Sequence, residues 1–253
     1  MKQAVLGSVR GAIMVLTRIP MSPVSSAAWR WAPAWFPAVG TGLGVLIAGV
    51  WWIAGAMGPV LASLMAVGAG VMLTGALHED GLADSADALG GGTSRDEVFR
   101  ILKDSRVGTY GALALILSAA VRVVALVELG PHAPVALVVS HTLARVTPVW
   151  LLKRLPYVSP VGVAKHRAVA QPAAGALSIA TMWSGVMMAG LWRHGSLSAL
   201  AAALAVASTA GVTVVCGFWF RRRLGGITGD LMGAAEQAVE MTVLVVLVAI
   251  LWP

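Results

Sequence analysis

Residues 36–57 read FPAVGTGLGVLIAGVWWIAGAM, a stretch without a single charged side chain. A helix that crosses a bilayer needs roughly 20 mostly apolar residues, so this segment predicts a transmembrane helix. Gly58 and Pro59 follow, a pair that is typical of a turn, and residues 60–77 are apolar again. The two segments together predict a helical hairpin inside a membrane.

Five more apolar segments follow, at about 107–128, 135–152, 174–192, 197–220 and 234–252. The chain is 58% hydrophobic, only 11% charged, and has a mean hydropathy of +0.84. We therefore expect an all-α fold: a polytopic integral membrane helical bundle of about seven transmembrane helices, forming one membrane-embedded domain over 1–253. Basic residues flank a short apolar run near the N-terminus, which predicts a retained interfacial helix there rather than a signal peptide.

The basic residues predict the orientation of the bundle. If the N-terminus is cytoplasmic, fifteen Lys and Arg side chains fall on the cytoplasmic side and only Arg193 on the other, while Arg122 and Arg145 stay within spans. Such an asymmetry is the positive-inside signal of membrane proteins. It predicts a multi-pass membrane protein with segments 78–106, 153–173 and 221–233 together on the cytoplasmic face.

Some functional classes are excluded by composition. The net charge of +7 does not indicate nucleic-acid binding, because no Lys/Arg-rich helix or interleaved aromatic run accompanies it. Cys216 is the only cysteine, so no disulfide framework exists.

The acidic residues are concentrated at two places. Seven of the eleven lie between Glu79 and Asp104, three lie between Asp230 and Glu240, and only Glu128 lies elsewhere. Carboxylates near a bilayer need cations, partners or water. The distribution therefore predicts a functional site built from these two stretches.

The first stretch reads HEDGLADSAD over 78–87 and ends in three glycines at 90–92. If the helix of 60–77 continues, Asp80, Asp84 and Asp87 fall at i, i+4 and i+7 and share one face. Three carboxylates on one face repel one another unless a cation lies between them, and Mg²⁺ prefers such oxygen ligands. The alternative is a solvated acidic helix end.

A second segment, KDSRVGTYG over 103–111, precedes the third span. Asp104 offers a further metal ligand or a proton acceptor, and Arg106 offers a guanidinium for a phosphate oxygen. The alternative is an ordinary helix start with an interfacial ion pair.

A third segment, LGGITGDLMG over 224–233, opens the last span. Glycine-rich backbone before a helix N-terminus is a potential anion site, because free amides and the helix dipole converge there. Asp230 is positioned to join the metal cluster, and the basic triplet 221–223 would strengthen anion binding.

Arg145 is costly in lipid and must face protein or water. Two alternatives stay open: a contact with substrate phosphate, or a structural partner for an acid such as Glu240. His78 is expected beside the metal rather than on it, since carboxylates already supply hard-ion ligands.

These three segments resemble the signatures of the cobalamin synthase family, the adenosylcobinamide-GDP ribazoletransferases. Residues 16–20 (LTRIP) and 35–40 (WFPAVG) are similar to its N-terminal pattern, so the resemblance runs in order from 16 to 234. One departure concerns the loop 155–162, where the family pattern predicts a basic residue near 159 and an acidic one near 161. Ser159 and Val161 stand there instead, which puts a substrate role for this loop in doubt.

The resemblance implies a Mg²⁺-dependent enzyme that joins adenosylcobinamide-GDP to α-ribazole, or to its 5′-phosphate, with release of GMP. It implies that the partners are the two substrates and the lipid bilayer of the prokaryotic cytoplasmic (inner) membrane, and that nucleic acid is not a partner. It leaves a homo-oligomer open. Carried onto this sequence, it makes Asp80, Asp84, Asp87, Asp104 and Arg106 the expected catalytic residues, and Asp80, Asp84, Asp87, Asp104 and Asp230 the expected metal ligands. The expected substrate contacts are His78, Glu79, Ser105, Arg145, Gly225, Gly226, Thr228 and Gly229.

A cation-coupled transporter is the alternative function, because ionisable residues inside spans are its usual mark. Transporter carboxylates tend toward the middle of the membrane on broken helices, whereas here they gather at the ends of the predicted spans.

Overall fold

The computed structural model of the protein describes residues 2–159 and 169–251. The described residues are almost entirely helical, and their only β contact is an isolated parallel bridge between Tyr157 and Ile227. The predicted all-α bundle is thereby confirmed. The helices are α1 (Lys2–Leu16), α2 (Ser26–Trp31), α3 (Phe36–Ala54), α4 (Pro59–Thr74), α5 (Leu77–Gly91), α6 (Arg95–Ile101), α7 (Thr109–Leu129), α8 (Ala133–Ala144), α9 (Thr147–Arg154), α10 (Ala176–Arg193), α11 (Ala199–Leu224) and α12 (Gly229–Leu251), with short 3₁₀ turns at Ala32–Trp35, Gly55–Met57 and Gly130–His132.

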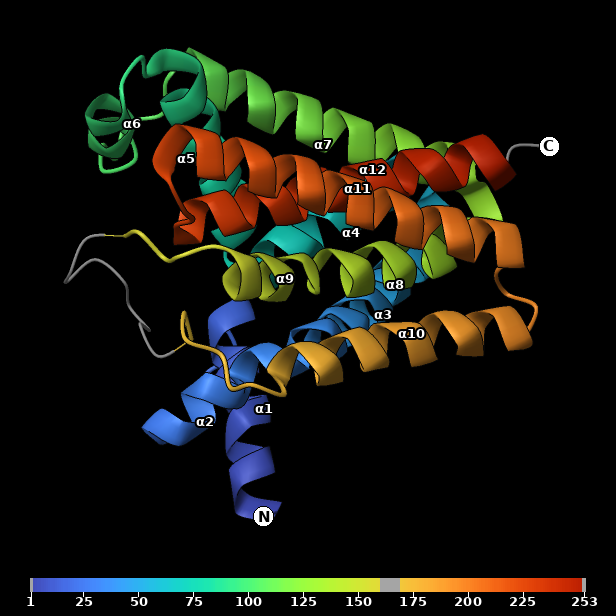
Figure 1. Ribbon diagram of the computed structural model, residues 1–253. Coiled ribbons are helices and arrows are strands. Elements are labelled where there is room, and N and C mark those ends of the chain that lie inside the picture. Colours follow the sequence, from blue (N-terminus) through green and yellow to red (C-terminus); the bar gives the residue numbers. More distant parts are fainter. Residues whose placement is uncertain (1, 160–168, 252–253) are drawn as a thin grey trace.

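Each of the seven predicted spans coincides with a helical segment. By length and composition, four stretches are able to cross a membrane: Ser26–Met57, Thr109–Arg154, Ala199–Leu224 and Gly229–Ile250. The bent pair α4 and α5 would make a fifth. The stretch Thr109–Arg154 holds both α7 and the returning α8–α9 (Figure 1). The number of crossings therefore stays a prediction.

The predicted fourth span is divided into α8 and α9 between Ala144 and Thr147. Pro148 stands at the start of α9. It has no amide hydrogen, and its ring crowds the carbonyl four residues earlier, so the helical hydrogen bonding is interrupted there.

The expectation that the second span continues as one helix past residue 77 is wrong. The chain turns by 90° between α4 and α5. Gly75 and Ala76 both adopt left-handed backbone conformations, with φ of 67° and 58°, and the Ala76 amide donates to the Val71 carbonyl in the manner of a Schellman motif. The Arg18 side chain packs so closely on Gly75 that a Cβ there would overlap it. The acidic helix α5 consequently lies across the end of the bundle (Figure 1).

Glycines allow the central helices to approach closely. In α3, a Cβ at Gly44 would lie 2.8 Å from the Leu137 carbonyl oxygen of α8. Small residues at such positions are how membrane helices pack without a hydrophobic driving force between them. The α3–α8 pair and α12 form the middle of the bundle, with a core that includes Leu43, Leu137 and Val243.

Three long polar segments meet at one end of the bundle (Figure 1). The Val158 amide donates to the Ile227 carbonyl, and the Ile227 amide donates to the Pro156 carbonyl. Arg223 donates to the carbonyls of Leu89 and Gly92. The described residues of the three segments therefore meet at one end of the bundle, as predicted. Val161 lies outside the described residues.

Candidate functional site

The site is built where α5 crosses the start of α12. A Cβ at Gly81 would lie 2.7 Å from the Asp230 carbonyl oxygen, and one at Gly233 would lie 3.4 Å from the His78 Cα. At position 81 only glycine permits this approach of one backbone to the other, whereas the distance at Gly233 is an ordinary van der Waals contact. The crossing brings Asp230 of α12 beside the acidic face of α5.

Asp84 lies among three other aspartates, Asp80, Asp87 and Asp230, and these four residues are called the acidic group here. Its carboxyl pKa is raised from 3.8 to about 6, first by partial burial and then by the neighbouring charges of Asp80, Asp230 and Asp87. Like charges that raise a pKa in this way favour a bound cation. The close grouping of Asp230 with the α5 aspartates agrees with the expected single site assembled from distant segments.

Asp87 has a structural role, because it is hydrogen-bonded to the backbone of another helix. Its two carboxylate oxygens accept hydrogen bonds from the backbone amides of Gly108 at 2.7 Å and Gly111 at 2.9 Å. These are amides at the start of α7, which have no partner within that helix. Asp87 therefore joins α5 to α7. Asp230 instead accepts a hydrogen bond at 3.5 Å from the hydroxyl of Thr228, two residues earlier in the chain.

Across the residues described, no three Asp, Glu, His or Cys side chains gather tightly enough to hold a metal ion by themselves. Mg²⁺ is commonly held by one or two carboxylates together with substrate phosphates and water. Asp80 is exposed and Asp84 and Asp230 are half-buried, so these oxygens are open to an ion that also contacts a ligand. The donor set fits Mg²⁺ in this shared form.

Asp104 is paired with Arg106 in the loop between α6 and α7. The Arg106 Nη2 lies 2.7 Å from Asp104 Oδ2, and Nε donates to Oδ1 at 3.0 Å. These hydrogen bonds lower the Asp104 carboxyl pKa to about 2. The Arg106 side chain is 86% exposed, and Ser105 beside it is exposed too. In this structure Asp104 and Arg106 therefore form an exposed ion pair with each other.

The glycine-rich segment between α11 and α12 is held by specific contacts. Gly225 ends α11 in a left-handed conformation with φ 76°. Gly226 packs directly on the Pro156 carbonyl, where a Cβ would overlap it. Thr228 accepts from the Leu231 amide at 3.3 Å, which caps α12. Gly229 is exposed, so the N-terminal end of α12 is open beside Asp230.

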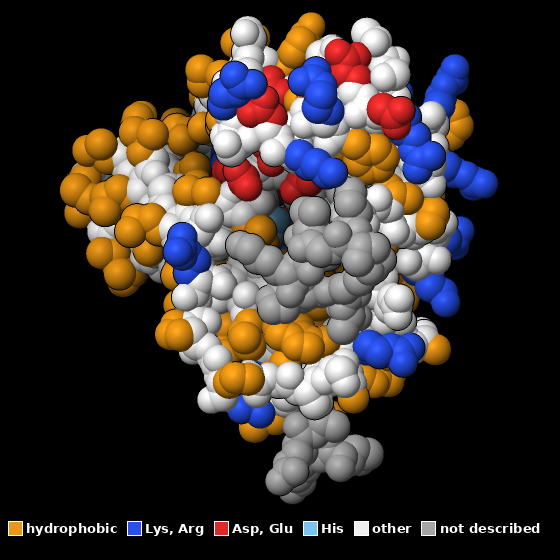
Figure 2. All heavy atoms as spheres, turned by 90° about the vertical axis from the view of Figure 1, so that its left-hand side faces the viewer, with side chains coloured by type: hydrophobic (Ala, Val, Ile, Leu, Met, Phe, Trp, Pro, Cys, Tyr) orange, Lys and Arg blue, Asp and Glu red, His pale blue; other side chains and the backbone are white. Residues whose placement is uncertain are grey.

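The three arginines of the basic triplet 221–223 have different surroundings. Arg223 is used to cap the C-terminal end of α5 through the Leu89 and Gly92 carbonyls. Arg221 and Arg222 are exposed. Figure 2 looks onto this end of the molecule and shows acidic and basic side chains gathered there. An anionic ligand would meet positive charge around the acidic group.

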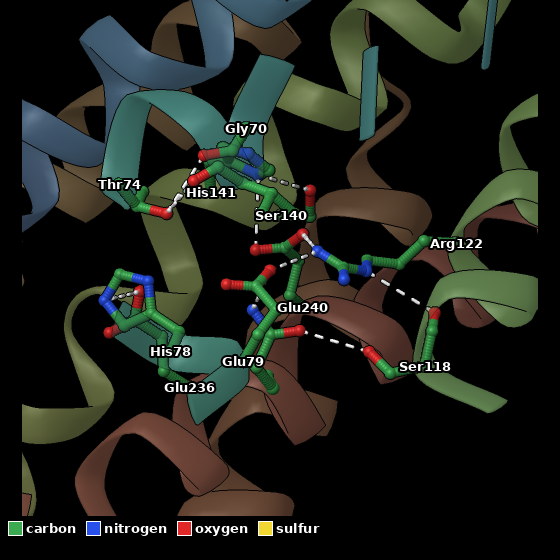
Figure 3. A network of polar contacts seen from close by, with 12 residues as sticks. Gly70, Thr74, His78, Glu79, Ser118, Arg122, Ser140, His141, Glu236 and Glu240 are labelled. Atoms are coloured by element: carbon green, nitrogen blue, oxygen red, sulfur yellow. Dashed lines mark hydrogen bonds and ion pairs between the residues drawn. The ribbon is translucent and has the colours of Figure 1, made fainter. Parts of the chain in front are cut away.

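A buried polar network lies behind the site (Figure 3). Arg145 Nε lies 2.7 Å from Glu236 Oε1 and its Nη1 lies 3.0 Å from Glu240 Oε2. Arg122 Nη1 lies 3.0 Å from Glu79 Oε1, and His78 Nε2 lies 3.1 Å from Glu236 Oε1. Gln237 and His141 complete the network. Buried charges of this kind must be paired, and breaking one pair typically costs about 3–5 kcal/mol.

Three residues that were expected to contact substrate belong to this buried network instead. His78, Glu79 and Arg145 are all buried, Arg145 to 2% exposure, and Figure 3 shows the side chains of His78 and Glu79 within the network. On α5, His78 and Glu79 lie away from the face that carries Asp80 and Asp84, as their helical spacing requires. Arg145 is the structural partner of Glu240, the second of its two alternatives.

The sequence reasoning missed several participants. Glu236, Gln237 and His141 were not singled out, although Glu236 and Glu240 stand four residues apart on an otherwise apolar helix. That spacing, opposite the intramembrane Arg122 and Arg145, was the available signal. The contact of Arg18 with Gly75 had no local signal.

Comparisons with known proteins agree with this geometry. Residues 8–248 match the family described as Cobalamin-5-phosphate synthase. The adenosylcobinamide-GDP ribazoletransferase of Leptothrix cholodnii is 39% identical over 91% of this chain and 90% of its own length. The proteins of the same name from Shewanella frigidimarina and Rhizobium etli are 37% identical over 94% of this chain and 93% of the relative, and 44% identical over 74% of this chain and 72% of the relative. No solved structure matches the chain. The match spans nearly all of the residues that build the bundle and its acidic crossing, and the chain belongs to the cobalamin-5-phosphate synthase family.

Proposed function

We propose that this chain is an adenosylcobinamide-GDP ribazoletransferase, working as a single membrane-embedded domain. It joins adenosylcobinamide-GDP to α-ribazole, or to α-ribazole 5′-phosphate, and releases GMP. The observation that carries the proposal is the convergence of Asp80, Asp84 and Asp230 where α5 crosses the start of α12. The names of the relatives at 37–44% identity support the substrate assignment.

The reaction exchanges one phosphorus–oxygen bond for another. A hydroxyl oxygen of the ribazole attacks the phosphorus that is joined to cobinamide, and the bond from that phosphorus to GMP breaks. When bound, Mg²⁺ would neutralise charge on the diphosphate and on the departing phosphate.

The chain's own groups hold and deprotonate the reactants. The N-terminal end of α12, with its positive helix dipole, faces the anionic phosphates, and the exposed Arg106 and Arg222 attract them. The proton of the attacking hydroxyl is accepted by a carboxylate of the acidic group. Asp84 is suited to this because its raised pKa of about 6 lies near the operating pH.

The orientation follows from the charge asymmetry. Segments 78–106, 153–173 and 221–233, which build the end with the acidic group, contain most of the Lys and Arg residues of the chain. We therefore place this end and the N-terminus on the cytoplasmic side of the prokaryotic inner membrane. Both substrates then reach the site from the cytoplasm. Whether the enzyme works as a homo-oligomer is left open.

The transporter alternative meets a spatial objection. Its intramembrane carboxylates would be Glu79, Glu236 and Glu240, which are engaged by Arg122, Arg145 and His78. The two cavities beside this network measure about 10 Å³ each, which is about the space of one water.

The deciding experiment measures GMP release by the purified protein with adenosylcobinamide-GDP, α-ribazole and Mg²⁺. We expect turnover in the parent protein and its loss, by about a hundredfold or more, in Asp84→Asn. Asp96→Asn is the matched control, since Asp96 is exposed on α6 and has no assigned role. Near-normal GMP release by Asp84→Asn at saturating Mg²⁺ would overturn the site assignment.

A further inference from the structure

A long apolar groove runs along α11, beside α8, α9 and α10. One cavity of about 300 Å³ lies between α8–α9, α10 and α11, and its lining includes Leu143, Val206 and Ala210. A second, of about 430 Å³, lies between the ends of α9 and α11. Both are lined by Trp150, Thr213 and Val214. The two cavities are therefore neighbouring parts of one groove that leads from the middle of the helices to the end of the bundle.

Three of the four hydroxyl-bearing side chains that line the groove already donate to backbone carbonyls. The Ser184 hydroxyl donates to the Ala180 carbonyl, the Thr209 hydroxyl to Ala205 and the Thr213 hydroxyl to Thr209. These three side chains therefore present methyl groups and hydrogen-bonded hydroxyls to the groove. A polar ligand would find few free hydrogen-bond donors along the groove. A hydrocarbon chain needs no hydrogen bonds and so gives up none by binding there.

The mouth of the groove is positively charged. Arg154 and Arg221 line the end cavity, and the Arg154 guanidinium lies 5.5 Å from the centre of the Trp150 ring. Neither arginine forms an ion pair with a carboxylate in the described part of the chain. Two guanidinium groups without counter-ions thus stand where the apolar groove reaches the end of the helices.

We propose that this groove binds an anionic phospholipid, with one acyl chain between α10 and α11 and the headgroup phosphate between Arg154 and Arg221. Basic pockets at the ends of transmembrane helices are a common way to bind acidic lipid headgroups. The charge of the mouth selects an anionic lipid, because a zwitterionic headgroup leaves part of the positive charge uncompensated. The apolar groove selects a chain-bearing molecule over a free phosphate.

The bound lipid would add contacts where the protein has few. α10 packs against the 3₁₀ turn Ala32–Trp35 and against α3 far more than against α11. An acyl chain in the groove would join α10 to α11, so we expect the lipid to stabilise the bundle.

The test uses the full chain in detergent, offered phosphatidylglycerol or phosphatidylcholine with identical acyl chains, and counts retained lipids by native mass spectrometry. We expect the parent to retain phosphatidylglycerol preferentially and to gain thermal stability from it. Arg154→Ala with Arg221→Ala should lower that preference by about fivefold or more. The control pair, Lys153→Ala with Arg222→Ala, removes the same charge from exposed neighbours that do not line the groove and should leave the preference unchanged.

A second variant tests the acyl chain and keeps both arginines. Ala210→Phe fills the groove and should abolish phosphatidylglycerol retention, whereas Ala207→Phe, on the same helix outside the groove, should not. Equal retention of the two lipids by the parent, equal effects of both arginine pairs, or retained phosphatidylglycerol in Ala210→Phe would each overturn the proposal. Free phosphate competing as well as the lipid would overturn it too.

Discussion

Asp84 and Asp87 lie one turn apart on α5 and have different surroundings. Asp84 stands among other carboxylates, which raise its pKa to about 6. Asp87 is bonded to two backbone amides of another helix. Their shared helical face was predicted from the spacing of Asp80, Asp84 and Asp87, and the structure confirms it. The partner of each side chain could not be predicted, because Gly108, Gly111 and Asp230 reach α5 only through the tertiary fold.

The raised pKa of Asp84 leads to a pH-dependent effect of Mg²⁺ on stability. The folded protein holds this proton more tightly than the unfolded chain, so the carboxyl stabilises the fold below about pH 3.8 and this contribution is lost as the pH rises through about 6. A bound cation offsets the repulsion that remains. We expect Mg²⁺ to raise the Tm clearly at pH 7.5 and little at pH 5, measured by thermal unfolding in detergent.

Asp84→Asn is the control for this effect, because it removes the carboxyl whose pKa is raised to about 6. The Mg²⁺ response should then become smaller and depend less on pH. An equal rise in Tm at both pH values in the parent protein would contradict the assignment of the ion to Asp84.

Asp87 gives a contrasting prediction. Asp87→Ala removes both bonds to the start of α7, and the loss of a helix cap costs about 0.5–2 kcal/mol. We expect a lower Tm in the absence of any metal, and saturating Mg²⁺ should not restore it. A Tm equal to that of the parent would show that the two hydrogen bonds contribute nothing to the stability of the fold.

At the scale of the elements, α5 is placed by the turn before it and by the helix it crosses. The turn at Gly75 and Ala76 depends on Arg18, a residue from the segment after α1. A run of apolar residues that continues to Leu77 gives no local sign of this contact, which is why the sequence predicted a straight helix. The glycines at 81 and 233 were visible in the motifs, but their roles at a helix crossing required the structure.

The crossing itself is testable through Gly81. A Cβ at this position would lie 2.7 Å from the Asp230 carbonyl oxygen, so Gly81→Ala should push α5 away from α12 and separate Asp84 from Asp230. We expect GMP release to fall by at least about tenfold, since small displacements of positioned groups are costly in catalysis.

Gly49→Ala is the matched control on α3, where a Cβ would meet nothing within 4 Å. It should keep full activity and a Tm equal to or above that of the parent, because alanine favours the helix by about 0.5–1 kcal/mol. Equal activity of the Gly81 and Gly49 variants would count against a site at the crossing.

For the whole molecule, the sequence predicted which segments meet but not how the interior is stabilised. The contacts of residues 156–158 with the segment before α12, and of Arg223 with the end of α5, confirm the shared end. Arg145 could not be assigned from the sequence, because pairing with Glu236 and Glu240 depends on the close packing of α8 beside α12. The distribution of charged residues along the sequence does not show which buried residues pair with each other.

The orientation of the bundle gives the last prediction. Thr93 lies at the end with the acidic group, and Ser196 lies between α10 and α11 at the opposite end, and both are exposed. In a Cys216→Ser background, a cysteine at position 93 should be labelled by a membrane-impermeant thiol reagent only after the cells are opened. A cysteine at position 196 should be labelled in intact cells. The physical reason is the fifteen-to-one distribution of Lys and Arg, since positively charged loops are retained in the cytoplasm. Labelling of position 93 from outside would place the acidic group on the far side of the membrane from the cytoplasmic nucleotide substrates.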